Sequence, residues 1–139
     1  MANKDKTATP TDLSGDAVEE ISSNLRRLLA DVFALYVKTK NFHWHMSGRH
    51  FRDYHLLLDE QATQIFAMTD DIAERARKIG GTTIRSISDV AKNQRLKDNN
   101  KESVAPLEMM RANAGLGSWR RSYTIFKMPQ RFNVFLTNW

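Results

Sequence analysis

Histidine and carboxylate side chains are concentrated in the middle of this chain of 139 residues. All four histidines lie within thirteen residues, namely His43, His45, His50 and His55. Three acids follow at spacings that suit one face of a helix, namely Asp59, Asp70 and Glu74. Imidazole and carboxylate are ligands that divalent metals such as iron accept. Because the chain has no cysteine, a metal would be held by nitrogen and oxygen alone, and the first hypothesis is a metal-binding protein.

The spacing of the ligand candidates indicates two half-sites. With His55 at zero on a helix, Asp59 lies at about 40°, Asp70 at about 60° and Glu74 at about 100°, and the two pairs are about 16 Å apart along the axis. Because metal–ligand bonds are about 2.0 to 2.2 Å long, one ion cannot bind both pairs of one chain. Two antiparallel copies would set the His/Asp pair of one chain against the Asp/Glu pair of the other. The spacing therefore favours a homodimer with two equivalent mixed sites.

A second interpretation of the same acids stays open. Asp70 and Glu74 lie close to three basic residues, Arg75, Arg77 and Lys78. Ion pairs between residues four apart would explain these acids as part of a solvated, charged helix face. Spacing alone does not separate this interpretation from a ligand face.

The remaining candidates carry structural alternatives as well. His43 lies twelve residues before His55, so a helical hairpin would bring the two together. Alternatively, His43 is a helix-terminal histidine that interacts with the helix dipole. We expect His45 and His50 to lie in the connecting loop and face water, and Trp44 to be a packing residue.

A long amphipathic helix precedes the histidines. Apolar residues recur three and four apart over residues 18–36, which predicts a helix from about Ser14 towards His43. Gly48 is a natural stop for this helix. The loop between it and the next helix is therefore short.

A second long helix carries the acids. It is predicted to start near Phe51 and to end at Gly80 and Gly81, where glycine accepts the left-handed cap conformation. Residues 83–96 have weaker periodicity and predict a short crossing helix, and Pro106 suits the first turn of a third helix. Together these elements predict an all-α fold, a helical bundle.

Length, charge and hydropathy limit the class of protein. The chain is long enough for one domain, and its longest apolar run, residues 32–37, is too short to span a bilayer. The N-terminus has no apolar signal core, so we expect a cytoplasmic protein with no membrane partner.

The net charge of +5 does not indicate a basic folded surface, because residues 1–108 hold 16 basic and 16 acidic residues. All five excess basic residues lie in residues 109–139, which have no acid. We predict a disordered arm at 1–11, a helical domain at 12–108 and an atypical tail at 109–139.

The motifs resemble those of one family, the Dps proteins, which are ferritin-like miniferritins that protect DNA in starved bacteria. The resemblance covers roughly residues 9–109 and has specific His-Trp, His-x-x-x-Asp and Asp-x-x-x-Glu spacings. The residues that carry it are Asn41, Phe42, His43, Trp44, Gly48, Phe51, His55, Asp59, Glu60, Asp70, Ile72, Ala73, Glu74 and Arg75. It implies a ferritin-like four-helix bundle in which the third and fourth helices are degraded or missing here. The Glu-x-x-His motif of standard ferritins is absent from this chain, which favours the Dps branch.

The resemblance also implies a site and an activity. His43, His55 and Asp59 of one subunit would bind iron together with Asp70 and Glu74 of the two-fold partner, and Trp44 would lie near the centre. Two iron positions are possible at each dimer interface. Such a ferroxidase oxidises Fe(II) to Fe(III), preferably with hydrogen peroxide rather than oxygen, and stores the product inside a homo-oligomeric shell of twelve subunits.

DNA binding is a further implication of the resemblance, through an N-terminal arm that carries Lys4 and Lys6 and associates with the bacterial nucleoid. So few charges would bind weakly per chain, with strong salt dependence, and an inert arm is the alternative. Two other classes of function stay open: a non-specific DNA-binding nucleoid protein and a non-redox zinc-binding protein.

The end of the chain departs from the family. Members continue with two long helices that contain acids, whereas residues 109–139 have no acid and are interrupted by Gly115, Gly117 and Pro129. This composition suggests a frameshifted or truncated reading of a Dps gene. An open pair of helices would expose its apolar face, so an inactive truncated member of the family is a further alternative.

Overall fold

The computed structural model of the protein describes residues 11–114. Its elements are helices α1 (Gly15–His45), α2 (Phe51–Lys78), α3 (Ile87–Asn93) and α4 (Pro106–Ala114). Across this described range there is no strand, which confirms the all-α fold class. Within the same range no helix is long and apolar enough to cross a membrane. Residues 1–10 of the predicted N-terminal arm, with Lys4 and Lys6, and most of the predicted tail lie outside the described residues.

The chain divides into two compact units, residues 1–103 and 104–139. The first unit contains α1, α2 and α3, and the second contains α4. The third helix that Pro106 predicted is α4, which continues past Glu108 to Ala114. The boundary that composition suggested at residue 108 therefore falls inside a helix.

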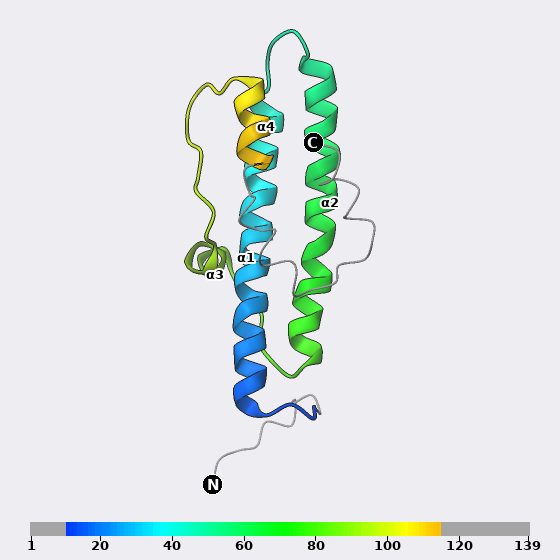
Figure 1. The fold of residues 1–139 in the computed structure, drawn as a ribbon, viewed down its shortest axis with the longest axis vertical. Helices are drawn as coiled ribbons and strands as arrows, with labels where there is room; N and C mark the ends of the chain where they lie inside the picture. Colours follow the sequence, from blue (N-terminus) through cyan, green and yellow to red (C-terminus); the bar gives the residue numbers. More distant parts are fainter. Residues whose placement is uncertain (1–10, 115–139) are drawn as a thin grey trace. The chain divides into compact units, whose positions relative to one another are not determined.

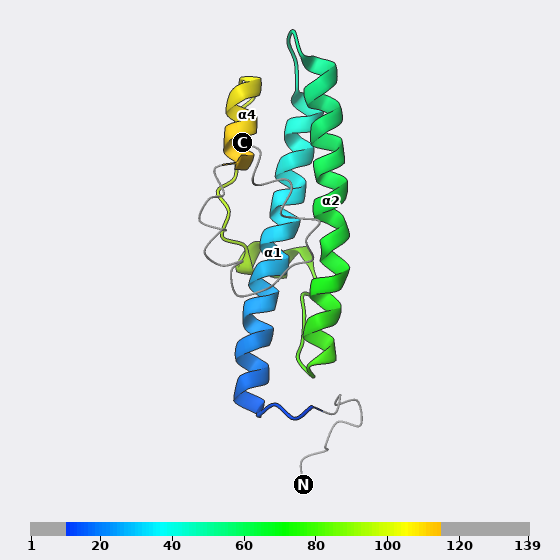
Figure 2. The same ribbon diagram turned by 45° about the vertical axis from the view of Figure 1, so that its right-hand side comes forward.

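The two long helices form an antiparallel hairpin. Figures 1 and 2 show α1 and α2 side by side along most of their length, joined by a short loop. The Ser14 hydroxyl caps α1 by accepting from the amide of Ala17 at 3.2 Å, which satisfies one of the free donors at the helix start. Gly48 in the loop has φ of 104°, a conformation that favours glycine, and its carbonyl accepts from the amide of Phe51 at 3.1 Å. The loop thus sets the start of α2 directly opposite the end of α1.

Buried apolar side chains come from both helices of the hairpin. On α1 they include Leu25, Leu29, Val32 and Phe42, and on α2 they include Leu58, Ala62, Ile72 and Ala76. They recur at helical spacing, which is the pattern that predicted the two helices. This apolar seam fixes which faces of α1 and α2 meet, and therefore which polar residues lie beside one another.

The end of α2 approaches α1 very closely. Gly80 has φ of 89°, and a Cβ placed on Gly81 would lie 1.7 Å from the hydroxyl oxygen of Ser22. The Gly81 amide donates to the carbonyl of Ala76 at 3.0 Å. The glycine pair predicted to end this helix therefore has two roles, a positive φ at the first and a close approach at the second.

The segment after α2 is fastened to α1 by a buried carboxylate. α3 packs on α1, and the segment that follows it brings Arg95 to Asp31, whose side chain is 2% exposed. The Arg95 backbone amide and Nε donate to the two Asp31 carboxylate oxygens at 2.7 and 2.9 Å. Further along, Lys38 Nζ donates to the carbonyl of Lys97 at 3.2 Å. The short crossing helix predicted for residues 83–96 is confirmed, and the segment that follows it is bonded to α1 at Asp31 and Lys38.

Candidate metal centre

Two histidines from opposite helices meet at the loop end of the hairpin. His43 lies in the last turn of α1, and His55 lies in the first turns of α2. Their rings stack with centroids 3.7 Å apart and an interplanar angle of 25°. His43 Nδ1 is 2.9 Å from the carbonyl oxygen of His55, and His55 Nδ1 is 3.0 Å from the carbonyl oxygen of His43. The hairpin thus joins the two residues by a reciprocal pair of hydrogen bonds.

This reciprocity fixes the tautomer of both rings. A carbonyl oxygen can only accept, so each Nδ1 must carry the proton and donate it. In the neutral imidazole the other nitrogen, Nε2, then keeps its lone pair. Metal-binding histidines commonly donate their second ring nitrogen to a carbonyl or carboxylate, which orients the ring and raises its basicity. His43 and His55 therefore both present a metal-binding nitrogen in a fixed orientation.

Asp59 adds a carboxylate one turn further along α2. Its Oδ1 is 3.8 Å from Nε2 of His43. Two donors that each bind one ion at about 2.0 to 2.2 Å can be at most about 4.4 Å apart, so this separation fits a shared metal. The same Oδ1 accepts a hydrogen bond from Lys40 Nζ at 2.5 Å. This hydrogen bond is the largest cause that holds the pKa of the Asp59 carboxyl below its usual value, and the charges of Lys40, His43 and His55 act in the same direction.

The surroundings of these three side chains are aromatic on one side. Phe51 stacks on His55 with centroids 4.9 Å apart, so the rings of Phe51, His55 and His43 form one continuous stack. Within residues 11–114 Trp44 does not serve as the expected packing residue, because it is 63% exposed. An exposed tryptophan beside the site is a surface that a second chain could cover.

The two other histidines do not join the site. His45 is the last residue of α1 and is exposed, and its Nδ1 lies 2.8 Å from the carbonyl oxygen of Asn41. His50 lies at the start of α2 and contacts Tyr54 edge to face, with ring centroids 6.0 Å apart. His50 is exposed, as expected for a loop histidine. His45 is exposed too, although it belongs to the helix rather than to the loop.

Asp70 and Glu74 lie elsewhere on α2. Glu74 forms the ion pair predicted for a charged face, since its Oε2 is 2.6 Å from Lys78 Nζ. This pairing lowers the pKa of Glu74 and raises that of Lys78. Asp70 is exposed and lines a groove on the hairpin. Among residues 11–114 of this one chain, no three histidine or acidic side chains converge into a complete metal site.

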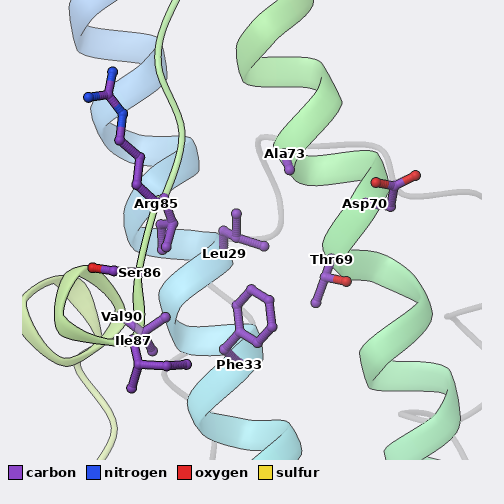
Figure 3. A pocket seen from close by; sticks show the side chains of 10 residues that line it. Leu29, Phe33, Thr69, Asp70, Ala73, Arg85, Ser86, Ile87 and Val90 are labelled. Atoms are coloured by element: carbon purple, nitrogen blue, oxygen red, sulfur yellow. The ribbon is translucent and has the colours of Figure 1, made fainter.

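The groove beside Asp70 is shallow and mostly apolar, with a volume of about 390 Å³. Figure 3 shows Phe33 and Thr69 pointing into the space between α1 and α2, with the segment that leads into α3 closing one side. Its lining consists of Leu29, Phe33, Thr69, Asp70, Ala73, Ile84, Arg85, Ser86, Ile87 and Val90. With a single acid and no histidine in its lining, the groove is not a metal site by itself.

Comparison with known proteins decides the family. The family model of the ferritin-like domain matches residues 22–114, which include most of α1, all of α2 and every described ligand candidate. The chain belongs to the ferritin-like family. This ferritin-like chain is 39% identical over 74 residues to DNA protection during starvation protein 1 of Deinococcus radiodurans. The matched stretch covers 53% of this chain and 36% of that protein. The chain is also 37% identical over 89 residues to the DNA protection during starvation protein of Agrobacterium fabrum, and this match covers 64% of the chain and 55% of that protein.

Solved structures agree with this assignment. DpsC from Streptomyces coelicolor superposes with a TM-score of 0.72 at 27% identity, and the match covers 77% of this chain and 62% of that one. Within the ferritin-like family the chain is of the Dps type, which confirms the resemblance seen in its motifs. The chain spans roughly a third to a half of the length of the curated relatives that it matches.

One residue that contacts the Asp59 carboxylate was missed from the sequence alone. Lys40 lies three residues before His43, so the two share a face of α1. That spacing was a usable signal, but the partner of Lys40 lies on the other helix. Only the register of α1 against α2 shows that its ammonium group meets Asp59.

Proposed function

We propose that this chain is a subunit of an iron-storing ferroxidase. His43, His55 and Asp59 of one chain bind ferrous iron together with Asp70 and Glu74 of a two-fold partner. The observation that carries the proposal is the reciprocal hydrogen bonding of the two histidines, because it leaves both Nε2 lone pairs available to a metal, and the Nε2 of His43 lies 3.8 Å from the Asp59 carboxylate.

A second chain is needed because one chain supplies only half of the ligands. In one chain His43 stacks on His55 and lies near the Asp59 carboxylate, but among the described residues no three such side chains could hold a metal by themselves, and Asp70 and Glu74 do not complete the group. An antiparallel partner returns the missing carboxylates to each site, giving two equivalent centres at one interface. With one or two irons in each centre, the partner's acids offset the positive charge. The exposed Trp44 lies beside the histidines, where the partner would cover it.

The ligand set suits an ion that changes its oxidation state. Imidazole helps to retain ferrous iron, while carboxylates stabilise the harder ferric ion. Two ferrous ions each lose one electron, and one hydrogen peroxide accepts both, so that its O–O bond breaks and two added protons give two waters. Iron is the substrate, and the product leaves for storage as ferric mineral in a shell of twelve subunits. We take peroxide to be preferred to oxygen.

Removal of iron and peroxide together protects DNA, because the two would otherwise generate hydroxyl radicals. This role follows the names of the relatives, which are DNA protection during starvation proteins. Contact with DNA would come from Lys4 and Lys6, repeated over the subunits of the shell. Such a protein would act in the bacterial cytoplasm at the nucleoid.

The test compares histidines inside and outside the site. Ferrous oxidation by hydrogen peroxide is followed by ferric absorbance on the full chain, after separation of assemblies by size. We expect His55→Ala and Asp59→Asn to lower the rate at least tenfold, since each removes a ligand. His45→Ala and His50→Ala, which change histidines outside the site, should leave it within about twofold. Equal rates for all four folded variants would refute the ferroxidase centre, and zinc uptake without oxidation would favour the non-redox alternative.

A further inference from the structure

Lys40 occupies the cation position of the half-site. Its Nζ lies 2.5 Å from Asp59 Oδ1, and the same oxygen lies 3.8 Å from Nε2 of His43. The oxygen that would bind a metal together with His43 is therefore already bound by an ammonium group. The Lys40 side chain is 19% exposed, so this group is held among protein atoms rather than extended into water.

We propose that Lys40 is an internal counter-ion that an incoming metal must displace. This inference rests on the proposed binding of metal by His43, His55 and Asp59, and it adds a regulating residue to that site. A divalent ion and the ammonium group of Lys40 cannot share Oδ1 of Asp59 closely, because like charges repel. When the ion binds, the flexible four-carbon stem of Lys40 lets its ammonium group swing away.

The counter-ion has two consequences for the empty half-site. It keeps the Asp59 carboxylate neutralised and oriented while no metal is present. It also raises the concentration of metal needed for occupancy, because the ion must replace a hydrogen-bonded charge. An ion that gains bonds to both imidazoles compensates for that loss, whereas an ion that prefers oxygen ligands alone does not. Lys40 therefore sets both the affinity and the selectivity of the half-site.

Cobalt(II) tests this without any oxidation step. Binding of Co²⁺ to the full chain is measured by calorimetry and by the visible absorption of the bound ion. We expect Lys40→Gln to bind Co²⁺ about tenfold more tightly, which corresponds to removing a unit charge roughly 6 Å from a divalent ion in a water-like dielectric. Lys40→Arg keeps the charge and should bind as the unchanged chain does. Lys38→Gln, two residues away and bonded to the carbonyl of Lys97, is the matched control and should also bind unchanged.

The result that overturns the proposal is equal or weaker binding by folded Lys40→Gln. His55→Ala separates that failure from a failure of the metal site itself. If His55→Ala binds Co²⁺ as well as the unchanged chain does, the site assignment is wrong and the role of Lys40 is refuted with it. If His55→Ala weakens binding while Lys40→Gln does not strengthen it, the metal site stands and only the counter-ion is refuted.

Chemical labelling of the unchanged chain gives a second measurement that needs no variant. Acetic anhydride modifies accessible amines, and mass spectrometry reads the extent at each lysine. We expect labelling of Lys40 to rise several-fold when Co²⁺ is added, because its ammonium group leaves Asp59. Labelling of Lys92, an exposed residue on α3, should not change. Labelling of Lys40 that is equal with and without bound Co²⁺ would contradict displacement.

Discussion

Two inactive variants should restore activity when they are combined, if each site takes ligands from two chains. His55→Ala damages the half-site that the hairpin assembles, and Glu74→Gln damages the acids that lie apart from it on α2. In a dimer of one chain of each kind, one site collects both defects and the other collects none. With equal amounts and random pairing, about half of the dimers are mixed, so about a quarter of all sites are intact.

The assay is ferrous oxidation by peroxide in co-expressed, differently tagged chains that are purified through both tags. Each variant alone should have almost no activity, and the co-expressed sample should reach about a quarter of the unchanged chain before selection. Isolated dimers that carry both tags should reach about a half of the activity of the unchanged chain, because one of their two sites is intact. A sample in which mixed dimers form without any gain in rate would refute the shared site. Recovery after mixing His55→Ala with Asp59→Asn would also refute it, because both defects lie in the same half-site.

Two further predictions concern the contacts that hold the hairpin together. Gly81→Ala should lower the free energy of unfolding by about 1 to 3 kcal/mol, measured by urea titration, because its methyl group would lie 1.7 Å from a buried hydroxyl oxygen. Gly15→Ala, where no atom lies within 4 Å, is the control and should not destabilise the chain. In the metal-free chain, carbon NMR should give Asp59 a pKa below that of an ordinary aspartate, about 3.9, and Lys40→Gln should raise it. The stability from the Lys40–Asp59 pair is complete above the pKa that Asp59 has in the unfolded chain, and it is lost as the pH falls through the lower pKa of the folded chain. If Lys40→Gln left the titration midpoint of Asp59 unchanged, the pairing would be contradicted.

Helical periodicity was sufficient to predict the hairpin because both helices bury one continuous apolar face. The spacing of residues 18–36 and the glycines at positions 48, 80 and 81 predicted α1, the loop and the end of α2 to within a few residues. The fastening of α3 was not predictable in this way. Asp31 and Arg95 are 64 residues apart, and nothing local to either residue indicates that they pair. An acid on an apolar helix face was a signal that some positively charged partner was required.

In the candidate site, too, contacts between residues close in sequence were predictable, and contacts between the two helices were not. His55 and Asp59 are four residues apart on one helix, so the sequence alone places them together. The meeting of His43 with His55 depends on the loop, and the sequence left it as one of two alternatives. The pairing of Glu74 with Lys78 is again local, and it realises the charged face that the spacing also allowed.

The local ion pairs and the proposed ligand roles are compatible. Asp59 and Glu74 are both bound by lysines in the metal-free chain, at 2.5 and 2.6 Å. In the absence of a metal, a carboxylate is stabilised by a charge-assisted hydrogen bond from a nearby ammonium group. Each half-site thus carries its own lysine, Lys40 on α1 and Lys78 on α2. Both lysines have flexible stems and Lys78 is largely exposed, so each ammonium group can leave its carboxylate by side-chain movement alone.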